Sequence, residues 1–337
     1  MARPPLPLTV IGGFLGAGKT TLLNRWLRET GGRRFAVLVN DFGAINIDAA
    51  LIASSAGDLV ALTNGCVCCQ IGDDLGAALM RVLDAPQPFD AVVVEASGVS
   101  DPARIGRYGR AVPELALDGV IVLVDASTGA AQAADPLLAD TLARQVTGAD
   151  LLIVNKLDVA TAAERAATLA WLAQSAPGVP RVETAQADVP LALLSSIGLT
   201  PEGHDGSHDH GSHDHGSHDH ASHDHGSHHE HRHPRAPQHG DLFETWSARP
   251  AQRFDRAALQ ALLNAMPPGV LRLKGVLPLQ ADGWCELQFA GRRGTLRALA
   301  QPPADGAAVV AIGLRDRLPR GTLAEAFGGR PLESGPG

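Results

Sequence analysis

A glycine-rich loop near the amino terminus constrains the fold of this chain more than any other feature. Gly13, Gly18, Lys19 and Thr20 fill the pattern G-x-x-x-x-G-K-S/T, between an apolar run at residues 6–11 and a segment with helical spacing. Glycines let successive backbone N–H groups turn toward an anion, and the following helix adds the positive end of its dipole. The alternative is a plain glycine-rich turn, but the strand–loop–helix context favours a phosphate-binding loop.

The residues of this loop have different expected roles. Lys19 can reach the β- and γ-phosphates of a nucleotide, and the hydroxyl of Thr20 can bind Mg²⁺. The backbone of the loop surrounds the phosphates, so we predict a set of nucleotide-binding residues: Gly13, Gly16, Ala17, Gly18, Lys19, Thr20 and Thr21.

The bulk composition narrows the class of protein. The chain has 337 residues and is 45% hydrophobic, which predicts a packed globular protein with two domains. Its net charge of −8 argues against a nucleic-acid groove and gives no reason to expect a membrane surface as partner. Residues 1–8 lack the basic start and apolar core of a signal peptide, and no apolar run approaches the ~20 residues of a membrane span. We therefore expect a soluble, cytoplasmic protein.

Apolar runs that alternate with helical segments predict an α/β domain over residues 1–200. In addition to residues 6–11, buried strands are expected at 35–39, 59–62, 91–94, 120–124, 151–154 and 182–185. The pattern predicts a P-loop NTPase fold, with a mainly parallel sheet and helices on both faces. Ligands of such sheets bind outside the carboxyl ends of the strands, so the residues that follow each strand are candidates for the site.

Two carboxylates follow such strands and lie near the phosphate loop in the expected fold. Asp41 comes one strand after the loop, and Glu95 ends the apolar run at 91–94. Glu95 is expected to hold the Mg²⁺ shell, and Asp41 is a candidate for Mg²⁺ or for the water network. For Asp41 the alternative is an ordinary turn with an Asx cap. The predicted catalytic residues are Lys19, Thr20, Asp41 and Glu95.

The tetrapeptide N-K-x-D follows the strand expected at 151–154. The carboxylate of Asp158 can accept hydrogen bonds from N1 and N2 of guanine, whereas adenine would leave it unpaired, and unpaired buried polar groups discriminate strongly. Asn155 can face the O6/N7 edge of the base, and the stem of Lys156 can cover the ring. At this place in the chain the motif favours GTP over ATP.

Three of the four cysteines lie within four positions, at Cys66, Cys68 and Cys69. Thiolates are soft ligands that select Zn²⁺, Cu⁺ or a similar metal, and three of them leave one coordination position open, which suits transfer. The alternative is that they are buried free cysteines that pack as small hydrophobes. The density of the cluster favours a metal site.

Residues 201–240 contain all fourteen histidines, and eight of them lie in repeats of Gly-Ser-His-Asp-His, in one of which alanine replaces glycine. With almost no apolar side chains, this segment is predicted to be a disordered linker, and histidine-rich tracts bind metals by composition. A purification tag is the alternative, and the internal position argues against it. The repeat supplies eight candidate ligands: His208, His210, His213, His215, His218, His220, His223 and His225.

Residues 241–328 predict a small α+β domain, followed by a frayed tail at 329–337. A helix is expected at 255–266, and strands are expected at 243–246, 270–275, 285–289 and 308–312. Cys285 lies within one of these strands and is expected to be structural.

Together the motifs resemble the CobW-like family of metal-chaperone GTPases. The resemblance rests on residues 13–20, 40–43, 95–98 and 155–158, and above all on Gly-Cys-Val-Cys-Cys at 65–69. It implies a P-loop GTPase whose cysteine motif binds a transition metal, with GTP binding coupled to metal handling. The chain departs from the family where Asp41 replaces glutamate and Ala44 replaces an acidic residue, and these changes leave the identity of the metal open.

Three functions compete at this point. The first is a GTPase that uses GTP and Mg²⁺, receives Zn²⁺ (or, as second choice, Co²⁺), and delivers it to a client protein or cofactor pathway. The second is a passive histidine-rich metal store, which has no need of the guanine-selective Asp158. The third is a P-loop kinase that acts on a small molecule, against which the thiolate cluster argues.

Overall fold

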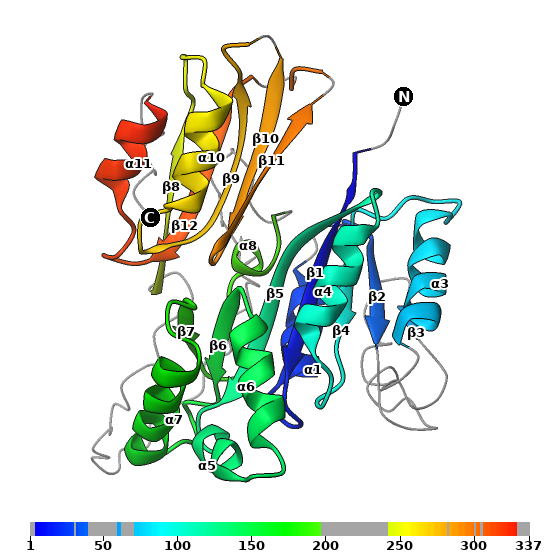
Figure 1. Cartoon of the computed structure of the whole chain (residues 1–337), viewed down its shortest axis with the longest axis vertical. Helices are drawn as coiled ribbons and strands as arrows, with labels where there is room; N and C mark the ends of the chain where they lie inside the picture. Colours follow the sequence, from blue (N-terminus) through cyan, green and yellow to red (C-terminus); the bar gives the residue numbers. More distant parts are fainter. Residues whose placement is uncertain are drawn as a thin grey trace, which may run out of the picture.

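The structure is a computed structural model in which two domains can be distinguished (Figure 1). It describes residues 4–29, 32–39, 59–61, 71–196, 242–281, 283–299, 301–303 and 306–328. The first domain is α/β and the second is α+β, as predicted. The histidine-rich linker and the tail expected at 329–337 lie outside the described residues.

The first domain is built on a seven-stranded sheet in which every described pair of strands is parallel. The order is β3-β2-β4-β1-β5-β6-β7. The strands are β1 (Leu6–Gly13), β2 (Phe35–Val39), β3 (Leu59–Ala61), β4 (Ala91–Glu95), β5 (Leu115–Asp125), β6 (Leu151–Asn155) and β7 (Arg181–Glu183). Strand β1 lies between β4 and β5, so the loop that follows it opens at the middle of the sheet.

Helices cover both faces of this sheet, as the pattern of apolar residues predicts. They are α1 (Lys19–Arg28), α3 (Ile71–Leu83), α4 (Pro102–Ala111), α5 (Gly129–Ala134), α6 (Ala139–Gly148), α7 (Ala162–Ser175) and α8 (Leu191–Leu194). Helix α1 buries Leu22 and Leu23 together with Trp26, which follows them by four and three residues and so lies on the same stripe. Trp26 also contacts Phe35 of β2 edge to face, with ring centroids 5.7 Å apart.

The second domain is a five-stranded antiparallel sheet in the order β11-β10-β9-β12-β8. Its elements are β8 (Phe243–Ala248), α10 (Arg256–Asn264), β9 (Val270–Pro278), β10 (Trp284–Ala290), β11 (Arg293–Leu299), β12 (Ala308–Leu314) and α11 (Arg320–Phe327). Its core includes Leu259 of α10 and Phe327 of α11, together with Cys285 of β10, which is fully buried. Burial raises the pKa of the Cys285 thiol, which suits the structural role expected for it.

The two domains share a hydrophobic core. Leu23 of α1 and Ile11 of β1 belong to the same buried cluster as Leu271 and Ile312 of the second sheet. The second domain therefore covers part of a face of the parallel sheet, alongside α1 and α8. Such shared burial holds the domains together through the hydrophobic effect.

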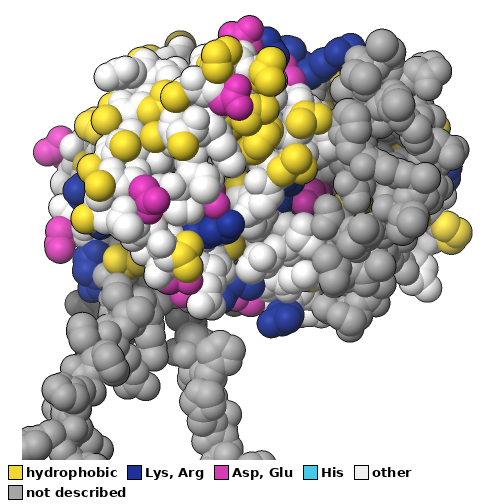
Figure 2. All heavy atoms as spheres, turned by 90° about the horizontal axis from the view of Figure 1, so that it is seen from below, with side chains coloured by type: hydrophobic (Ala, Val, Ile, Leu, Met, Phe, Trp, Pro, Cys, Tyr) yellow, Lys and Arg dark blue, Asp and Glu magenta, His cyan; other side chains and the backbone are white. Residues whose placement is uncertain are grey.

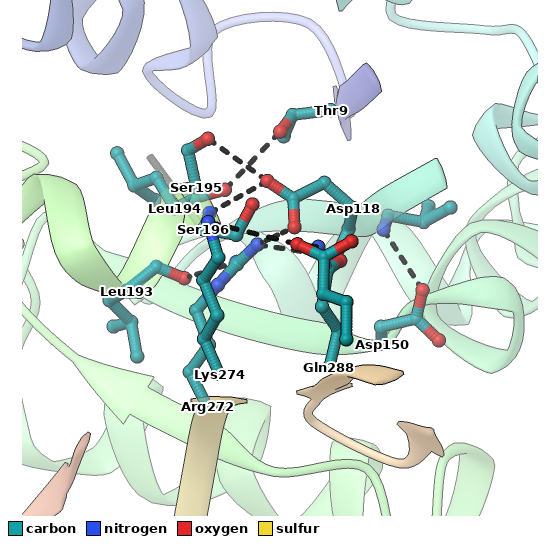
Figure 3. Close-up of polar contacts among 12 residues, drawn as sticks. Thr9, Asp118, Asp150, Leu193, Leu194, Ser195, Ser196, Arg272, Lys274 and Gln288 are labelled. Atoms are coloured by element: carbon teal, nitrogen blue, oxygen red, sulfur yellow. Dashed lines mark hydrogen bonds and ion pairs between the residues drawn. The ribbon is translucent and has the colours of Figure 1, made fainter. Parts of the chain in front are cut away.

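A buried ion pair adds a polar connection at this interface. The carboxylate of Asp118 in β5 pairs with the guanidinium of Arg272 in β9, and both side chains are at most 3% exposed. The same carboxylate accepts hydrogen bonds from Ser195 Oγ (2.9 Å) and Ser196 N (2.7 Å). Figure 3 shows these three residues converging on Asp118. Arg272 also donates to the backbone oxygen of Leu193, at 3.1 Å.

This ion pair explains an error in the expected strand boundaries. The strand predicted at 120–124 begins five residues earlier, at Leu115, and runs through Asp118 and Gly119. An aspartate followed by glycine normally indicates a turn. Here the carboxylate is neutralised by Arg272, a residue more than 150 positions away, so the strand continues through it.

Candidate nucleotide-binding site

The loop between β1 and α1 has the backbone geometry of an anion cradle. Gly13 and Gly18 have φ values of 132° and 106°, in the region that favours glycine. A side chain at Gly13 would collide with the carbonyl oxygen of Leu123, and one at Gly18 would collide with the amide of Asn155. Both positions therefore require glycine, and the loop closes directly onto the start of α1. This geometry aims backbone N–H groups and the helix dipole at one point.

Lys19 is held inside this loop. Its Nζ donates hydrogen bonds to the backbone oxygens of Gly13 (2.9 Å) and Phe14 (3.2 Å), and the residue is only 8% exposed. The ammonium group is thus fixed over the concave side of the loop, where the predicted phosphates would lie. A buried ammonium is stabilised when it gains an anionic partner.

The hydroxyl of Thr20 and the carboxylate of Glu95 lie side by side. Thr20 Oγ1 in the first turn of α1 donates to Glu95 Oε1 at the end of β4, at 3.1 Å. Glu95 is 2% exposed and ends β4, next to β1 in the sheet. Hydroxyl and carboxylate oxygens are hard ligands that suit Mg²⁺. The residues present therefore fit a magnesium ion, which would neutralise phosphate charge when bound.

The loop that follows Glu95 packs against the phosphate loop. A side chain at Gly98 would collide with Leu15, so only glycine allows this close approach. Gln145 of α6, which is 1% exposed, donates from Nε2 to the backbone oxygens of Gly98 (3.0 Å) and Ser100 (2.9 Å). Gln145 was not identified from the sequence, because a single glutamine on a helix carries no motif. It fixes the loop after β4 relative to the phosphate loop.

Asn155 ties the tetrapeptide N-K-x-D to two other loops. Its Nδ2 donates to the backbone oxygen of Ala17 at 3.0 Å, and its Oδ1 accepts from the backbone nitrogen of Ala187 at 2.7 Å. An amide has two hydrogens and two lone pairs, so one of each remains for the expected contact with a base. The residue thus positions the phosphate loop against the loop after β7.

Lys156 and Asp158, the other two defined residues of the N-K-x-D motif, differ in exposure. Lys156 has a φ of 65° and forms an ion pair from Nζ to Asp125 Oδ2 at 2.8 Å. Burial raises the pKa of Asp125, but hydrogen bonds from Lys156 and Ser127 outweigh this effect and hold the pKa below its usual range. Asp125 therefore stays ionised and orients Lys156. Asp158 is exposed in the turn before α7, where it can meet a ligand.

Several predicted site residues lie outside the described part of the chain. They are Asp41, the three clustered cysteines Cys66, Cys68 and Cys69, and the eight histidines between His208 and His225. Within the described residues, no group of three or more His, Cys, Asp or Glu side chains could hold a metal ion. Among the described helices, none has the length and apolarity needed to cross a membrane.

The surface around the phosphate loop is mixed in character. Figure 2 views the molecule from below, toward the carboxyl ends of the parallel strands, and shows hydrophobic side chains among charges of both signs. Leu15 of the phosphate loop, Val99 after β4 and Val159 after β6 are exposed in the loops at this end. The described residues thus place Gly13–Thr20, Glu95 and Asn155–Asp158 at one edge of the sheet.

The strand–loop–helix geometry, the contacts of Lys19 within the loop and the contact between Thr20 and Glu95 are those of a P-loop nucleotide-binding protein. Residues 7–182 match the family profile described as "CobW/HypB/UreG, nucleotide-binding domain". Residues 243–329 match the profile described as "Cobalamin synthesis protein cobW C-terminal domain". The chain therefore belongs to the CobW family, which confirms the resemblance found in its motifs.

Three curated relatives are similar to this chain over part of its length. The "Zinc chaperone YjiA" of Escherichia coli is 39% identical over 170 residues, which is 48% of this chain and 52% of YjiA. The "Zinc chaperone CobW" of Pseudomonas aeruginosa is 32% identical over 242 residues, 61% of this chain and 64% of that protein. The "Zinc-regulated GTPase metalloprotein activator 1" of Schizosaccharomyces pombe is 33% identical over 168 residues, 46% and 40% of the two chains. The chain thus spans about half the length of the first of these relatives.

Proposed function

We propose that this protein is a GTP-hydrolysing metallochaperone that binds a transition metal and delivers it to a client. The substrate is GTP, with Mg²⁺ as cofactor, and the cargo is Zn²⁺, with Co²⁺ as second choice. One observation carries the nucleotide half of the proposal. The phosphate loop, the Thr20–Glu95 pair and the N-K-x-D turn are joined at one edge of the sheet through the hydrogen bond from Asn155 to Ala17.

Each described residue has a defined role in the proposed hydrolysis. The backbone of the loop and Lys19 bind the phosphates, and the fixed ammonium stabilises the charge that develops on them. Thr20 and Glu95 would hold Mg²⁺, which would further neutralise the phosphates. Asp158 selects guanine by accepting hydrogen bonds from N1 and N2. Asp41 is proposed to order the attacking water or the magnesium shell.

The metal half of the proposal rests on the cysteine cluster and on the relatives. Thiolates at Cys66, Cys68 and Cys69 suit Zn²⁺ and leave one position open for transfer. Two of the curated relatives are named zinc chaperones and a third a zinc-regulated GTPase metalloprotein activator. The histidines at 208–225 are proposed to hold further metal more weakly, as a local supply for the thiolates.

Replacement of Lys19 by methionine is expected to lower kcat/KM for GTP hydrolysis about 10²–10³-fold, the usual cost of losing one preorganised charged donor. Methionine keeps the buried stem, so the fold is retained. The matched control is Lys274→Met, which removes an ammonium from β9, where Lys274 lies 3.9 Å from Glu286. Steady-state hydrolysis of GTP measures the difference. Equal activity of the two variants would remove Lys19 from the mechanism.

The metal-binding regions are tested by counting Zn²⁺ bound to protein purified without a metal-affinity column. Deletion of residues 204–239 is expected to remove weakly bound Zn²⁺ but leave one tight equivalent, because thiolates bind zinc more strongly than a solvated histidine tract. The triple change of Cys66, Cys68 and Cys69 to serine is expected to remove that equivalent.

The number of Zn²⁺ ions that the histidine tract binds is expected to fall as the pH drops through about 6.5, because imidazole then gains a proton and no longer binds metal.

The same experiment separates the proposal from a passive metal store. Survival of tight binding in the serine variant would show that the histidines hold the main ion and would favour storage. A small-molecule kinase would instead retain its activity in both metal-site variants.

A further inference from the structure

A pocket lies between the two domains, at the end of the parallel sheet away from the phosphate loop. Its volume is about 70 Å³, whereas one water molecule needs about 10–15 Å³. Asp118 of β5 lines the pocket, and Asp125 at the carboxyl end of the same strand lies beside Lys156. Residues 118–125 of an extended strand span about 23 Å. The pocket is therefore separate from the nucleotide site.

Arginines from both domains dominate the lining of this pocket. They are Arg110 of α4, Arg272 of β9, and Arg293 and Arg297 of β11. Two aspartates also line it, and each already has a cationic partner: Asp118 pairs with Arg272, and Asp150 pairs with Arg293. Four positive and two negative groups leave a formal charge of +2. Within the described part of the chain, the guanidinium groups of Arg110 and Arg297 make no hydrogen bond or ion pair.

A buried hydroxyl group also lines the pocket. Ser196 is 2% exposed, and its Oγ has no hydrogen-bond partner among the described residues. The backbone nitrogen of Ser196 donates to Asp118, which fixes the residue in place beside Arg272 (Figure 3). A buried hydroxyl without a partner costs free energy, so an acceptor inside the pocket would be stabilised by it.

The guanidinium of Arg110 lies near another positive charge. Burial lowers the pKa of Arg110, and the nearby guanidinium of Arg293 lowers it further, while Asp150 acts in the opposite direction. Two cationic side chains thus face each other with incomplete compensation. A bound anion would offset the repulsion between these two guanidinium groups.

We propose that this pocket binds a small oxyanion of the phosphate class, held by Arg110 and Arg297 with the hydroxyl of Ser196 as a further donor. The planar guanidinium fork matches the oxygens of phosphate, and such hydrogen bonds are charge-assisted. Because Arg110 belongs to the first domain and Arg297 to the second, the anion bridges the two domains. It reinforces the interface beside the buried pair of Asp118 and Arg272.

The test is isothermal titration of the full-length protein with inorganic phosphate. The protein is saturated with a non-hydrolysable GTP analogue and Mg²⁺, so that the γ-phosphate position of the phosphate loop is filled, and sodium chloride keeps the ionic strength constant. We expect saturable binding at one site. Arg110→Gln and Arg297→Gln are each expected to weaken it about tenfold or more, since each removes charge-assisted hydrogen bonds. Ser196→Ala is expected to weaken it by a smaller factor.

The matched control is Arg104→Gln, because Arg104, like Arg110, is an exposed arginine of α4 but does not line the pocket. It is expected to leave phosphate affinity unchanged. Absence of saturable binding to the wild type would overturn the proposal. The proposal would also be overturned if Arg110→Gln and Arg297→Gln bound phosphate as tightly as Arg104→Gln, because the phosphate would then bind elsewhere.

Discussion

Replacement of Asp158 by alanine is expected to lower the affinity for GTP about 10²–10⁴-fold while leaving ATP binding nearly unchanged. The carboxylate is proposed to accept two hydrogen bonds from guanine, and each charge-assisted bond contributes about 1.5–3 kcal/mol. Adenine offers neither donor, so the substitution removes no hydrogen bond from bound ATP. Asp158→Asn is expected to shift the preference toward xanthine nucleotides, because its amide presents a donor where the carboxylate accepted.

The matched control for Asp158 is Glu325→Gln, which removes one negative charge from an exposed position on α11 of the other domain. Competition titrations with GTP, ATP and XTP measure the preference of each variant. Equal affinity of the wild-type protein for GTP and ATP would contradict the proposed role of Asp158.

Replacement of Arg272 by methionine is expected to lower the free energy of unfolding by about 3–5 kcal/mol. Breaking a buried ion pair on one side leaves an uncompensated charge in the interior, which costs far more than losing an exposed pair. Here the carboxylate of Asp118 would keep only its hydrogen bonds from Ser195 and Ser196. Urea unfolding monitored by circular dichroism measures the change.

The double variant Asp118→Asn/Arg272→Met provides the control for this prediction. It removes both charges but keeps an oxygen that can accept from Ser195 or Ser196. Its stability is expected to exceed that of Arg272→Met alone, because no buried charge is left unpaired. A loss below about 1 kcal/mol for Arg272→Met would mean that the pair behaves as an exposed one and does not join the domains.

Local patterns predicted the elements that carry the nucleotide site. The apolar runs at 6–11, 35–39 and 91–94 became β1, β2 and β4, and the helical spacing of Leu22, Leu23 and Trp26 became the buried stripe of α1. These elements could be predicted because apolar runs and helical periodicity are patterns among residues that are close in the sequence. The order of the strands then places their carboxyl ends, and with them Lys19 and Glu95, at one edge.

Contacts between distant residues could not be predicted in the same way. The amide of Asn155 was expected to meet a base, and the structure also gives it two backbone partners, Ala17 and Ala187. Arg272 looked like an ordinary strand residue until the fold brought it to Asp118. Strand β11 was missed because it is a half-exposed edge strand with arginines at 293 and 297, where apolar alternation is weak.

We propose that the bound nucleotide controls metal binding. The most direct test of this coupling is the Zn²⁺ affinity of one protein in three nucleotide states. Residues 204–239 are deleted to remove the histidine background, and Zn²⁺ is titrated against nucleotide-free protein, the GDP complex and the complex with a non-hydrolysable GTP analogue. Ordering of residues 40–43 by the γ-phosphate is proposed to change the cysteine geometry at 66–69. We predict that Zn²⁺ affinity differs about 5–150-fold between the GDP and GTP-analogue states, with an equal reciprocal change in nucleotide affinity. Identical Zn²⁺ affinities in all three states would contradict the account.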